Sequence, residues 1–287
     1  MAETINKIEP FKDIVIYNED CRDTIKRMFE ENVKVDLTVT SCPYDSLRTY
    51  NNSSTWNFEI FKEIAKLLYD VTADGGIVVW VVGDATLNGS ETGTSFRQEL
   101  YFMECGFKLH DTMLFEKNSV AFNASRTSKR YTQIFEYMFV FSKGKPKTAN
   151  LICDKINKWA GYTNFGKNTD YNKNGELIVK KDIKPVPEFS PRTNIWKYTT
   201  GFNINEGKHP AVFPYQLAED HIRTWSNEGD LVFDPFTGSG TTASAVLCNN
   251  RKFIGSEIDE TYFRFIPNNI QKRYERHLKE LKKKNKF

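Results

Sequence analysis

The sequence predicts an α/β fold, because strand-like apolar runs alternate with helix-like segments along most of the chain. One of these runs, 77–82, is apolar enough to be buried on both faces, which is typical of parallel strands covered by helices. With 39% hydrophobic and 27% charged residues and a net charge of +3, the 287 residues should form one or two folded domains. We therefore expect a doubly wound, mostly parallel sheet.

The first predicted elements lie before residue 45. A short strand is expected over 13–17, followed by a helix over 23–31 in which Asp23 is the N-cap. The β-branched run 35–40 predicts a buried strand, and it stops at the turn Ser-Cys-Pro-Tyr, which is held by Pro43. The chain thus leaves a buried strand directly into a turn.

Helical and strand-like patterns then alternate up to residue 145. Apolar residues at helical spacing predict a helix over 58–69, ended by Asp-Gly-Gly, and the apolar strand 77–82 follows it. A further helix over 95–104 is closed by Gly106. Two more strands are expected after it, at 109–115 and 136–141.

The composition changes over 146–209, where Asn, Lys, Gly and Pro are abundant and one clear strand is expected, at 176–180. Regular alternation then resumes with a helix at 214–226, a strand at 231–233, a turn at 234–240, a helix at 241–249, a strand at 253–257 and a basic helix at 262–284. The predicted organisation is a discontinuous sheet domain over 11–145 and 210–270, an irregular basic insert over 146–209, and a basic C-terminal helix or tail over 271–287.

The positive charge is concentrated in two segments. Residues 143–209 carry 13 Lys and Arg against 6 Asp and Glu, and residues 271–287 carry 8 against 2, which leaves a net charge of −10 on the rest. In the first segment the basic residues are interleaved with aromatic ones, as in surfaces that stack on bases. An anionic partner is therefore expected, with nucleic acid as the leading candidate.

Several classes of protein are disfavoured. The five cysteines are scattered without a C-x-x-C spacing, so we expect neither a disulfide framework nor a metal site. The N-terminus lacks an apolar targeting segment, and no stretch approaches the roughly 18 apolar residues of a membrane span. A cytoplasmic location is the expectation.

A glycine turn follows the predicted strand 231–233. Gly238 and Gly240 allow backbone conformations and a close approach of a ligand, and the free N–H groups of the following helix can bind an anionic group. Glu257 lies at the end of the next strand, where an acidic side chain could accept hydrogen bonds from both hydroxyls of a ribose. The pattern indicates an adenosine-containing cofactor.

The run Asp-Pro-Phe-Thr-Gly-Ser-Gly-Thr at 234–241, with Phe-Ile-Gly-Ser-Glu-Ile-Asp-Glu-Thr-Tyr at 253–262, resembles the S-adenosylmethionine site of amino-directed DNA methyltransferases. A nicotinamide site is disfavoured, since its first glycine usually follows the strand at once. The resemblance implies a Rossmann-like methyltransferase fold. It also implies these cofactor-binding residues: Asp20, Lys208, His209, Pro210, Asp234, Phe236, Gly238, Ser239, Gly240, Thr241 and Glu257.

The turn after the strand 35–40 is similar to the target-base motif of the same family, Asp/Asn/Ser-Pro-Pro-Tyr. The resemblance implies that the Ser41 hydroxyl and the Cys42 carbonyl accept the two hydrogens of an exocyclic amine, which favours pyramidal nitrogen in the transition state. Pro43 would fix the loop, and Tyr44 would stack on a base turned out of the duplex. This chain departs from the family at Cys42, where proline is usual, which puts the rigidity of the loop in question.

The order of the motifs, target-base motif, basic insert and cofactor motif, is that of the β class, in which the insert recognises DNA. The predicted function is therefore site-specific DNA methylation, and serine at position 41 favours cytosine N4 over adenine N6. Methylation of RNA or of a protein side chain stays open, as does a DNA-binding homologue without catalysis. Also open are a cognate restriction endonuclease as partner, and whether the protein is a monomer or a homodimer.

Overall fold

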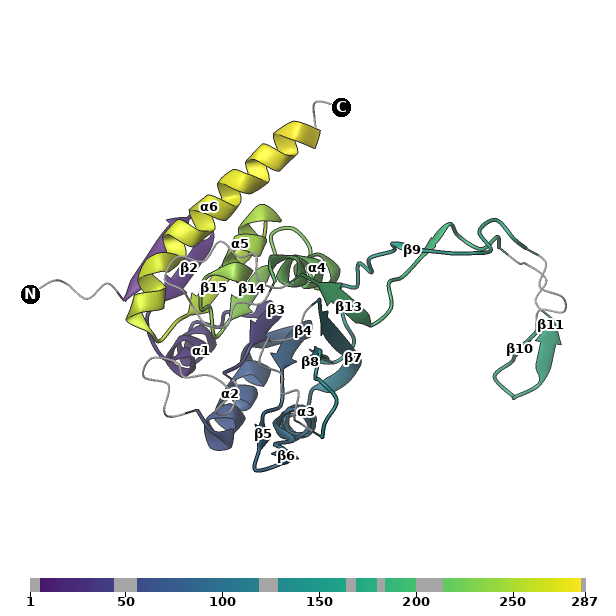
Figure 1. Ribbon diagram of the computed structural model, residues 1–287, viewed down its shortest axis with the longest axis horizontal. Helices are drawn as coiled ribbons and strands as arrows, with labels where there is room; N and C mark the ends of the chain where they lie inside the picture. Colours follow the sequence, from purple (N-terminus) through teal and green to yellow (C-terminus); the bar gives the residue numbers. More distant parts are fainter. Residues whose placement is uncertain are drawn as a thin grey trace, which may run out of the picture. The chain divides into compact units, whose positions relative to one another are not determined.

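A computed structural model describes residues 6–43, 56–118, 129–163, 169–179, 184–199 and 214–284. The chain divides into two compact units: a larger unit, Met1–Asn150 with Asn194–Phe287, and a smaller unit, Leu151–Thr193. The larger unit is built on a nine-stranded sheet with helices on both faces (Figure 1). The prediction of an α/β fold with a mostly parallel sheet is confirmed.

The strands of the sheet are mostly parallel. In spatial order they are β1 (Lys7–Phe11), β2 (Ile14–Tyr17), β15 (Lys252–Ser256), β14 (Leu231–Asp234), β3 (Val35–Ser41), β4 (Thr72–Val82), β8 (Phe135–Ser142), β7 (Lys108–Lys117) and β13 (Ile195–Tyr198). Of these described strands, β1 pairs antiparallel with β2, and β8 pairs antiparallel with both of its neighbours. The remaining neighbours are parallel. A separate hairpin is formed by β5 (Thr86–Leu87) and β6 (Ser90–Glu91).

Of the helices in the described part of the chain, three cover each face of the sheet. One layer is α1 (Cys21–Glu30), α2 (Phe58–Val71) and α3 (Thr94–Glu104), and the other is α4 (Tyr215–Trp225), α5 (Thr241–Cys248) and α6 (Glu260–Lys284). Each layer has its own apolar core. Phe61 and Phe102 pack with Trp80 of β4 on the first face, whereas Ala243 and Ile266 share a core with the neighbouring Val79 on the second. The alternation of Val79 and Trp80 between the faces is the two-residue period expected of a strand.

Two of the sequence predictions about the first elements are corrected. The N-cap of α1 is Asp20 rather than Asp23, because the extended Asp20 accepts the backbone N–H of Arg22 at 2.9 Å while Asp23 lies in the first turn. The strand predicted at 77–82 begins earlier, at Thr72, directly after α2. In addition, β1, a short edge strand that pairs with β2, was not predicted from the sequence.

The smaller unit contains two hairpin-like pairs of short strands. These are β9 (Lys155–Ile156) with β12 (Phe189–Ser190), and β10 (Thr169–Tyr171) with β11 (Leu177–Val179). The unit is shorter than the predicted insert 146–209, because β13 pairs in parallel with β7 and so belongs to the main sheet. Within the described part of the chain, no helix combines the length and apolar character needed to cross a membrane.

The order of the strands creates a switch point between β3 and β14. These strands are parallel neighbours, with Val232 beside Leu37 and Phe233 beside Thr38. The helix that next follows β3, α2, packs on one face, and the helix that follows β14, α5, packs on the other. Ligands of doubly wound sheets bind in the crevice that such a divergence opens at the carboxyl ends of the strands.

Candidate active site at the carboxyl ends of β3 and β14

The predicted target-base motif lies at the end of β3. Ser41 is the last residue of the strand, is half-buried and lies beside Val81 of β4. Cys42 is buried, and Pro43 is half-buried. Tyr44 lies outside the described residues. Three of the four predicted catalytic residues therefore lie at the switch point, at the carboxyl end of β3.

The predicted cofactor turn follows β14. Gly238 and Gly240 have φ angles of 54° and 83°, in the left-handed region that favours glycine. At Gly240 space is also limiting, because a Cβ atom there would lie 2.9 Å from Cγ2 of Ile266 on α6. Asn269 of α6 donates a hydrogen bond to the carbonyl of Ser239 at 3.0 Å. Close packing on α6 thus fixes the shape of the turn.

A buried hydrogen bond joins the two motifs directly. The Thr40 hydroxyl, next to Ser41 in the chain, donates to Oδ1 of Asp234 at 2.6 Å. The same carboxylate oxygen accepts the backbone N–H of Phe236 at 3.0 Å, which closes the cofactor turn. The carboxylate of Asp234 therefore organises the loop and ties it to β3.

Burial makes the Asp234 carboxylate costly to ionise. Asp234 is 1% exposed, and desolvation raises its pKa to about 6, although hydrogen bonds from the hydroxyls of Thr40 and Thr242 and from the Phe236 N–H oppose the rise. Thr40 was not among the site residues predicted from the sequence. A signal was present, since most buried hydroxyl groups have a hydrogen-bond partner.

Glu257 stands at the end of the neighbouring strand β15. Its two carboxylate oxygens accept the backbone N–H groups of Gly238 and Asp259, both at 2.8 Å. Burial raises the pKa of Glu257 to about 7. A carboxylate offers about four acceptor positions, so the oxygens can accept further hydrogen bonds. The residues therefore fit an adenosine ribose at this position, and the ribose role of Glu257 stays a prediction.

Asp20 and Asn18 lie beyond Glu257, at the carboxyl end of β2. The side-chain amide of Asn18 donates to the carbonyl of Glu257 at 2.7 Å, which joins the two strand ends. The carboxylate of Asp20 caps α1 and forms an ion pair with Arg22 at 2.8 Å. Burial favours protonation of Asp20, but the hydrogen bonds and charge of Arg22 outweigh it and lower the pKa. Asp20 is thus held ionised by its own helix.

Aromatic rings pack against the cofactor turn. Phe236 of the cofactor turn meets Trp56 edge-on, with ring centroids 5.5 Å apart, and lies 6.1 Å from the ring of Trp80 on β4. Phe236 was predicted from the sequence, whereas Trp80 was not, because it is typical of an ordinary residue in a buried strand. An indole N–H in such a strand, which must find an acceptor, is the signal that was overlooked.

The other predicted residues have mixed positions. Ser239 and Thr241 lie in the cofactor turn and at the start of α5, with their hydroxyl oxygens 3.3 Å apart. Lys208, His209 and Pro210 fall outside the described residues. Among the residues that the structure describes, no group of three or more His, Cys, Asp and Glu side chains is placed to hold a metal ion.

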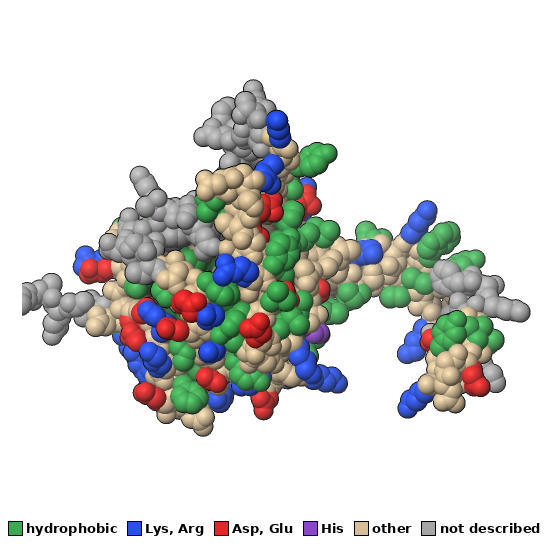
Figure 2. Space-filling model, turned by 90° about the horizontal axis from the view of Figure 1, so that it is seen from below, with side chains coloured by type: hydrophobic (Ala, Val, Ile, Leu, Met, Phe, Trp, Pro, Cys, Tyr) green, Lys and Arg blue, Asp and Glu red, His purple; other side chains and the backbone are tan. Residues whose placement is uncertain are grey.

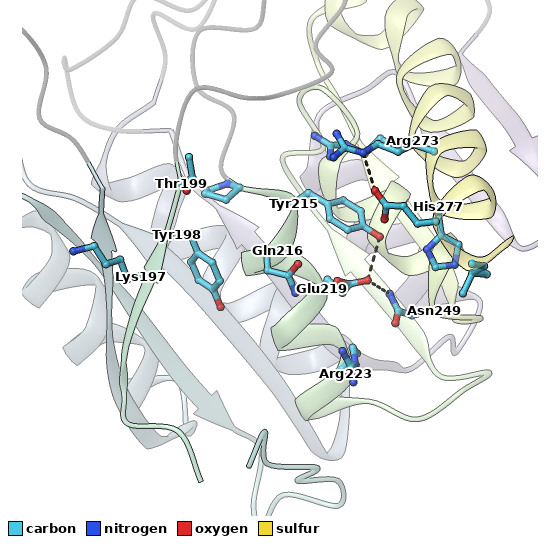
Figure 3. Close-up of a pocket in the computed structure, with 14 residues that line it drawn as sticks. Lys197, Tyr198, Thr199, Tyr215, Gln216, Glu219, Arg223, Asn249, Arg273 and His277 are labelled. Atoms are coloured by element: carbon cyan, nitrogen blue, oxygen red, sulfur yellow. Dashed lines mark hydrogen bonds and ion pairs between the residues drawn. The ribbon is translucent and has the colours of Figure 1, made fainter. Parts of the chain in front are cut away.

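A polar groove of about 750 Å³ lies elsewhere in the larger unit, between β13, α4, α5 and α6 (Figure 3). On its wall, the Tyr215 hydroxyl donates to Glu219 at 3.3 Å, and the guanidinium of Arg273 lies 4.8 Å from the Tyr215 ring. Burial raises the pKa of Tyr215. None of the predicted cofactor residues that the structure describes lines this groove, so it is distinct from the switch-point crevice.

Solved structures of DNA methyltransferases have the same fold. The PvuII cytosine-N4-specific DNA methyltransferase is 21% identical, with a TM-score of 0.61 and coverage of 92% of both chains. The complex of M1.HpyAVI with S-adenosylmethionine is 24% identical, with a TM-score of 0.58 over 89% of this chain and 98% of that one. At this level of identity the likeness establishes the fold.

Comparisons of sequence show the family of the chain in addition to its fold. The orphan methyltransferase M.BamHII of Bacillus amyloliquefaciens is 54% identical over 233 residues, which is 79% of this chain and 85% of that protein. The type II methyltransferase M.MthZI of Methanothermobacter thermautotrophicus is 27% identical over 256 residues, 85% of this chain and 66% of that one. The N6/N4 family model described as DNA methylase matches residues 35–268. The predictions of a DNA amino-methyltransferase and of S-adenosylmethionine as cofactor are confirmed at family level, and the chain belongs to the N6/N4 family of DNA methylases.

Proposed function

We propose that this chain methylates the exocyclic amino group of a base in a specific DNA sequence, and that the base is cytosine, methylated at N4. The observation that carries the proposal is the hydrogen bond between Thr40 and Asp234. It joins the residue that precedes the target-base motif to the cofactor turn, so the group that receives the methyl and the group that supplies it would meet at one switch point.

The residues of the target-base motif would prepare the amino group. Its lone pair is delocalised into the base ring, which makes the nitrogen a poor nucleophile. The Ser41 hydroxyl oxygen and the Cys42 carbonyl would accept its two N–H groups, favour a pyramidal nitrogen and stabilise the positive charge that develops on it. When bound, S-adenosylmethionine supplies an electrophilic methyl group on a sulfonium sulfur. Most of the rate would come from alignment.

The neighbouring strand ends would hold the cofactor. Glu257 is positioned by two backbone N–H groups and keeps acceptor positions for the ribose hydroxyls. The turn through Gly238 and Gly240 would let the backbone approach the ligand closely. Phe236, set against Trp56 and Trp80, would provide an apolar wall at the same place. For Tyr44 and for Lys208, His209 and Pro210, the roles given by the resemblance stay predictions.

The smaller unit would recognise the DNA. Its aromatic side chains are exposed, with Trp159 56% and Tyr171 69% accessible. Lysines accompany them, and the ammonium of Lys158 lies 5.6 Å from the centre of the Trp159 ring. Exposed rings and exposed cations are what contacts with phosphates and bases require. On the visible face of the larger unit, acidic and basic side chains are interspersed (Figure 2).

The preference for cytosine rests on Ser41, which matches the serine form of the target-base motif. Adenine N6 is the alternative, since both bases offer an amino group with the same hydrogen-bonding demand. The family match favours DNA over the RNA and protein substrates that the sequence left open.

The test is product identification. The protein is incubated with duplex DNA and S-adenosylmethionine labelled on the methyl group, and the DNA is digested to nucleosides. We expect labelled N4-methylcytosine. Labelled N6-methyladenine would overturn the choice of base but keep the reaction, and an RNA substrate incubated in parallel checks the nucleic acid. The absence of any methylated nucleoside, with the cofactor bound, would indicate a DNA-binding protein without catalysis.

A further inference from the structure

The side chain of Cys42 is directed into the protein and not into the crevice. Cys42 is 1% exposed, and its Sγ lies 3.6 Å from Oε1 of Gln98 and 3.9 Å from the carbonyl of Val81. This is the position at which the family motif usually has proline. The thiol therefore lies outside the reacting groups, and its neighbours hold a loop that lacks the usual ring.

Gln98 is the centre of these contacts. It lies on α3, is 1% exposed, and its Oε1 also accepts the indole N–H of Trp80 at 2.7 Å. An indole N–H can only donate, so the bond requires the carboxamide oxygen, rather than its nitrogen, to face Trp80. The same oxygen is then available to the Cys42 thiol. Trp80 thus fixes the orientation of Gln98 toward Cys42.

The start of α3 is tied to the same edge of the sheet. Asp84, two residues after β4, accepts the backbone N–H of Ser95 at 3.0 Å and also the Ser95 hydroxyl. The Thr92 hydroxyl donates to the same carboxylate at 3.2 Å. Gln98 comes three residues after Ser95 on the same helix, so these contacts set the position of Gln98 relative to β4. A continuous chain of buried contacts leads from β4 through α3 to Cys42.

We propose that Gln98 is a positioning residue for methyl transfer, acting through the thiol of Cys42 on the direction of the Cys42 carbonyl. A proline fixes its own φ angle near −65°, whereas a cysteine does not. Here a side-chain contact with Gln98 replaces that restraint. The proposal rests on the proposed function, in which the Cys42 carbonyl accepts an N–H of the target amine. Small displacements of such a group cost about 10²-fold in rate at the extreme.

The first test is a cycle of variants assayed for kcat on duplex DNA. Gln98→Met keeps the length of the side chain but removes the acceptor, and should lower kcat about tenfold while the KM values for DNA and cofactor change less than about threefold. In a Cys42→Pro background, where the ring restrains the loop, the same Gln98→Met change should alter kcat less than about twofold. An equal loss in both backgrounds, or none in either, overturns the proposal.

A control separates positioning from loosening of the core. Leu68→Ala removes a fully buried side chain of α2 from the same apolar layer without touching the network. It should lower the melting temperature at least as much as Gln98→Met, with kcat changed less than about twofold at temperatures where both variants are folded. A kcat loss in Leu68→Ala equal to that in Gln98→Met would mean that Gln98 has a merely structural role.

A second measurement does not depend on DNA methylation. The rate at which iodoacetamide alkylates Cys42 is followed by mass spectrometry in the native protein and in Gln98→Met. Loss of the Gln98 contact should raise this rate at least about fivefold, because the thiol is released from its buried position. The exposed Cys153 provides the internal reference. An unchanged alkylation rate at Cys42 overturns the proposed contact network, whether or not a methylated base is found. If only the proposed function is wrong, Gln98→Met still accelerates alkylation of Cys42.

Discussion

The switch-point crevice and the smaller unit differ in how far their polar and aromatic groups are exposed to solvent. In the crevice the carboxylates of Asp234 and Glu257 are buried, and each accepts hydrogen bonds from within the chain. In the smaller unit the aromatic side chains of Trp159 and Tyr171 are each more than half exposed. Groups fixed in this way suit chemistry that depends on alignment, and exposed groups suit a surface completed by a partner. Substitutions in the crevice should therefore change turnover or cofactor affinity, and those in the smaller unit should change DNA binding.

The largest effect is expected from Ser41→Ala. Loss of an acceptor that acts on developing charge should lower kcat about 10² to 10³-fold, while the Kd for DNA changes less than about threefold. Single-turnover methylation and fluorescence anisotropy measure the two quantities. Ser90→Ala, in the exposed β6, is the control and should leave both unchanged. Equal losses of kcat and DNA affinity would place Ser41 in binding and weaken the contrast between the two regions.

The next effect is expected at Glu257. Glu257→Ala removes the acceptor proposed for two ribose hydroxyls, so the Kd for S-adenosylmethionine should rise about 10 to 100-fold. Glu257→Gln should also weaken binding, since its NH₂ group would face one of the N–H groups of Gly238 and Asp259. Isothermal calorimetry gives the affinities. Wild-type affinity in both variants would remove the ribose role.

Glu257 also has a consequence for stability against pH. Burial raises its pKa from 4.5 to about 7 in the folded protein, so between these values the folded state binds more protons than the unfolded state. The contribution of Glu257 to the free energy of unfolding should therefore fall as pH rises from about 4.5 to 7. Denaturant titrations of wild type and Glu257→Gln at pH 5, 6 and 7 give this contribution as the difference between their free energies of unfolding. A difference that does not change with pH would contradict the prediction.

A smaller effect is expected from breaking the link between the two motifs. Thr40→Val leaves Asp234 without one of its buried donors and should lower the free energy of unfolding by about 1–3 kcal/mol, with kcat reduced about tenfold. Thr38→Val is the matched control on the same strand, since the Thr38 hydroxyl is buried without a hydrogen-bond partner among the described residues. It should be neutral or stabilising. Equal destabilisation of the two variants would show that the Thr40 contact contributes nothing.

The same contrast explains how far the sequence could lead. Strand ends such as Ser41 and Asp234 were predictable, because apolar runs mark parallel strands and the motifs follow them directly. The contacts of Thr40 with Asp234 and of Gln98 with Cys42 were not, since the partners are separated by 194 and 56 positions and meet only through the strand order. The extent of the smaller unit was also misjudged, because Trp196 and Tyr198 have the aromatic character of the insert yet belong to the main sheet.

The smallest effect is expected in the smaller unit and tests its proposed role most directly. The double variant Lys155→Gln, Lys158→Gln removes two exposed cations. If both contact phosphates, the slope of log Kd against log salt should become shallower by about 2, with weaker DNA binding at every sequence tested. Since both side chains are exposed, stability and cofactor affinity should change little, within about 0.5 kcal/mol. Lys12→Gln with Lys66→Gln, two exposed lysines of the larger unit, is the matched control and should leave the slope unchanged. If the double variant Lys155→Gln, Lys158→Gln leaves the slope unchanged, these exposed lysines do not contact DNA phosphates.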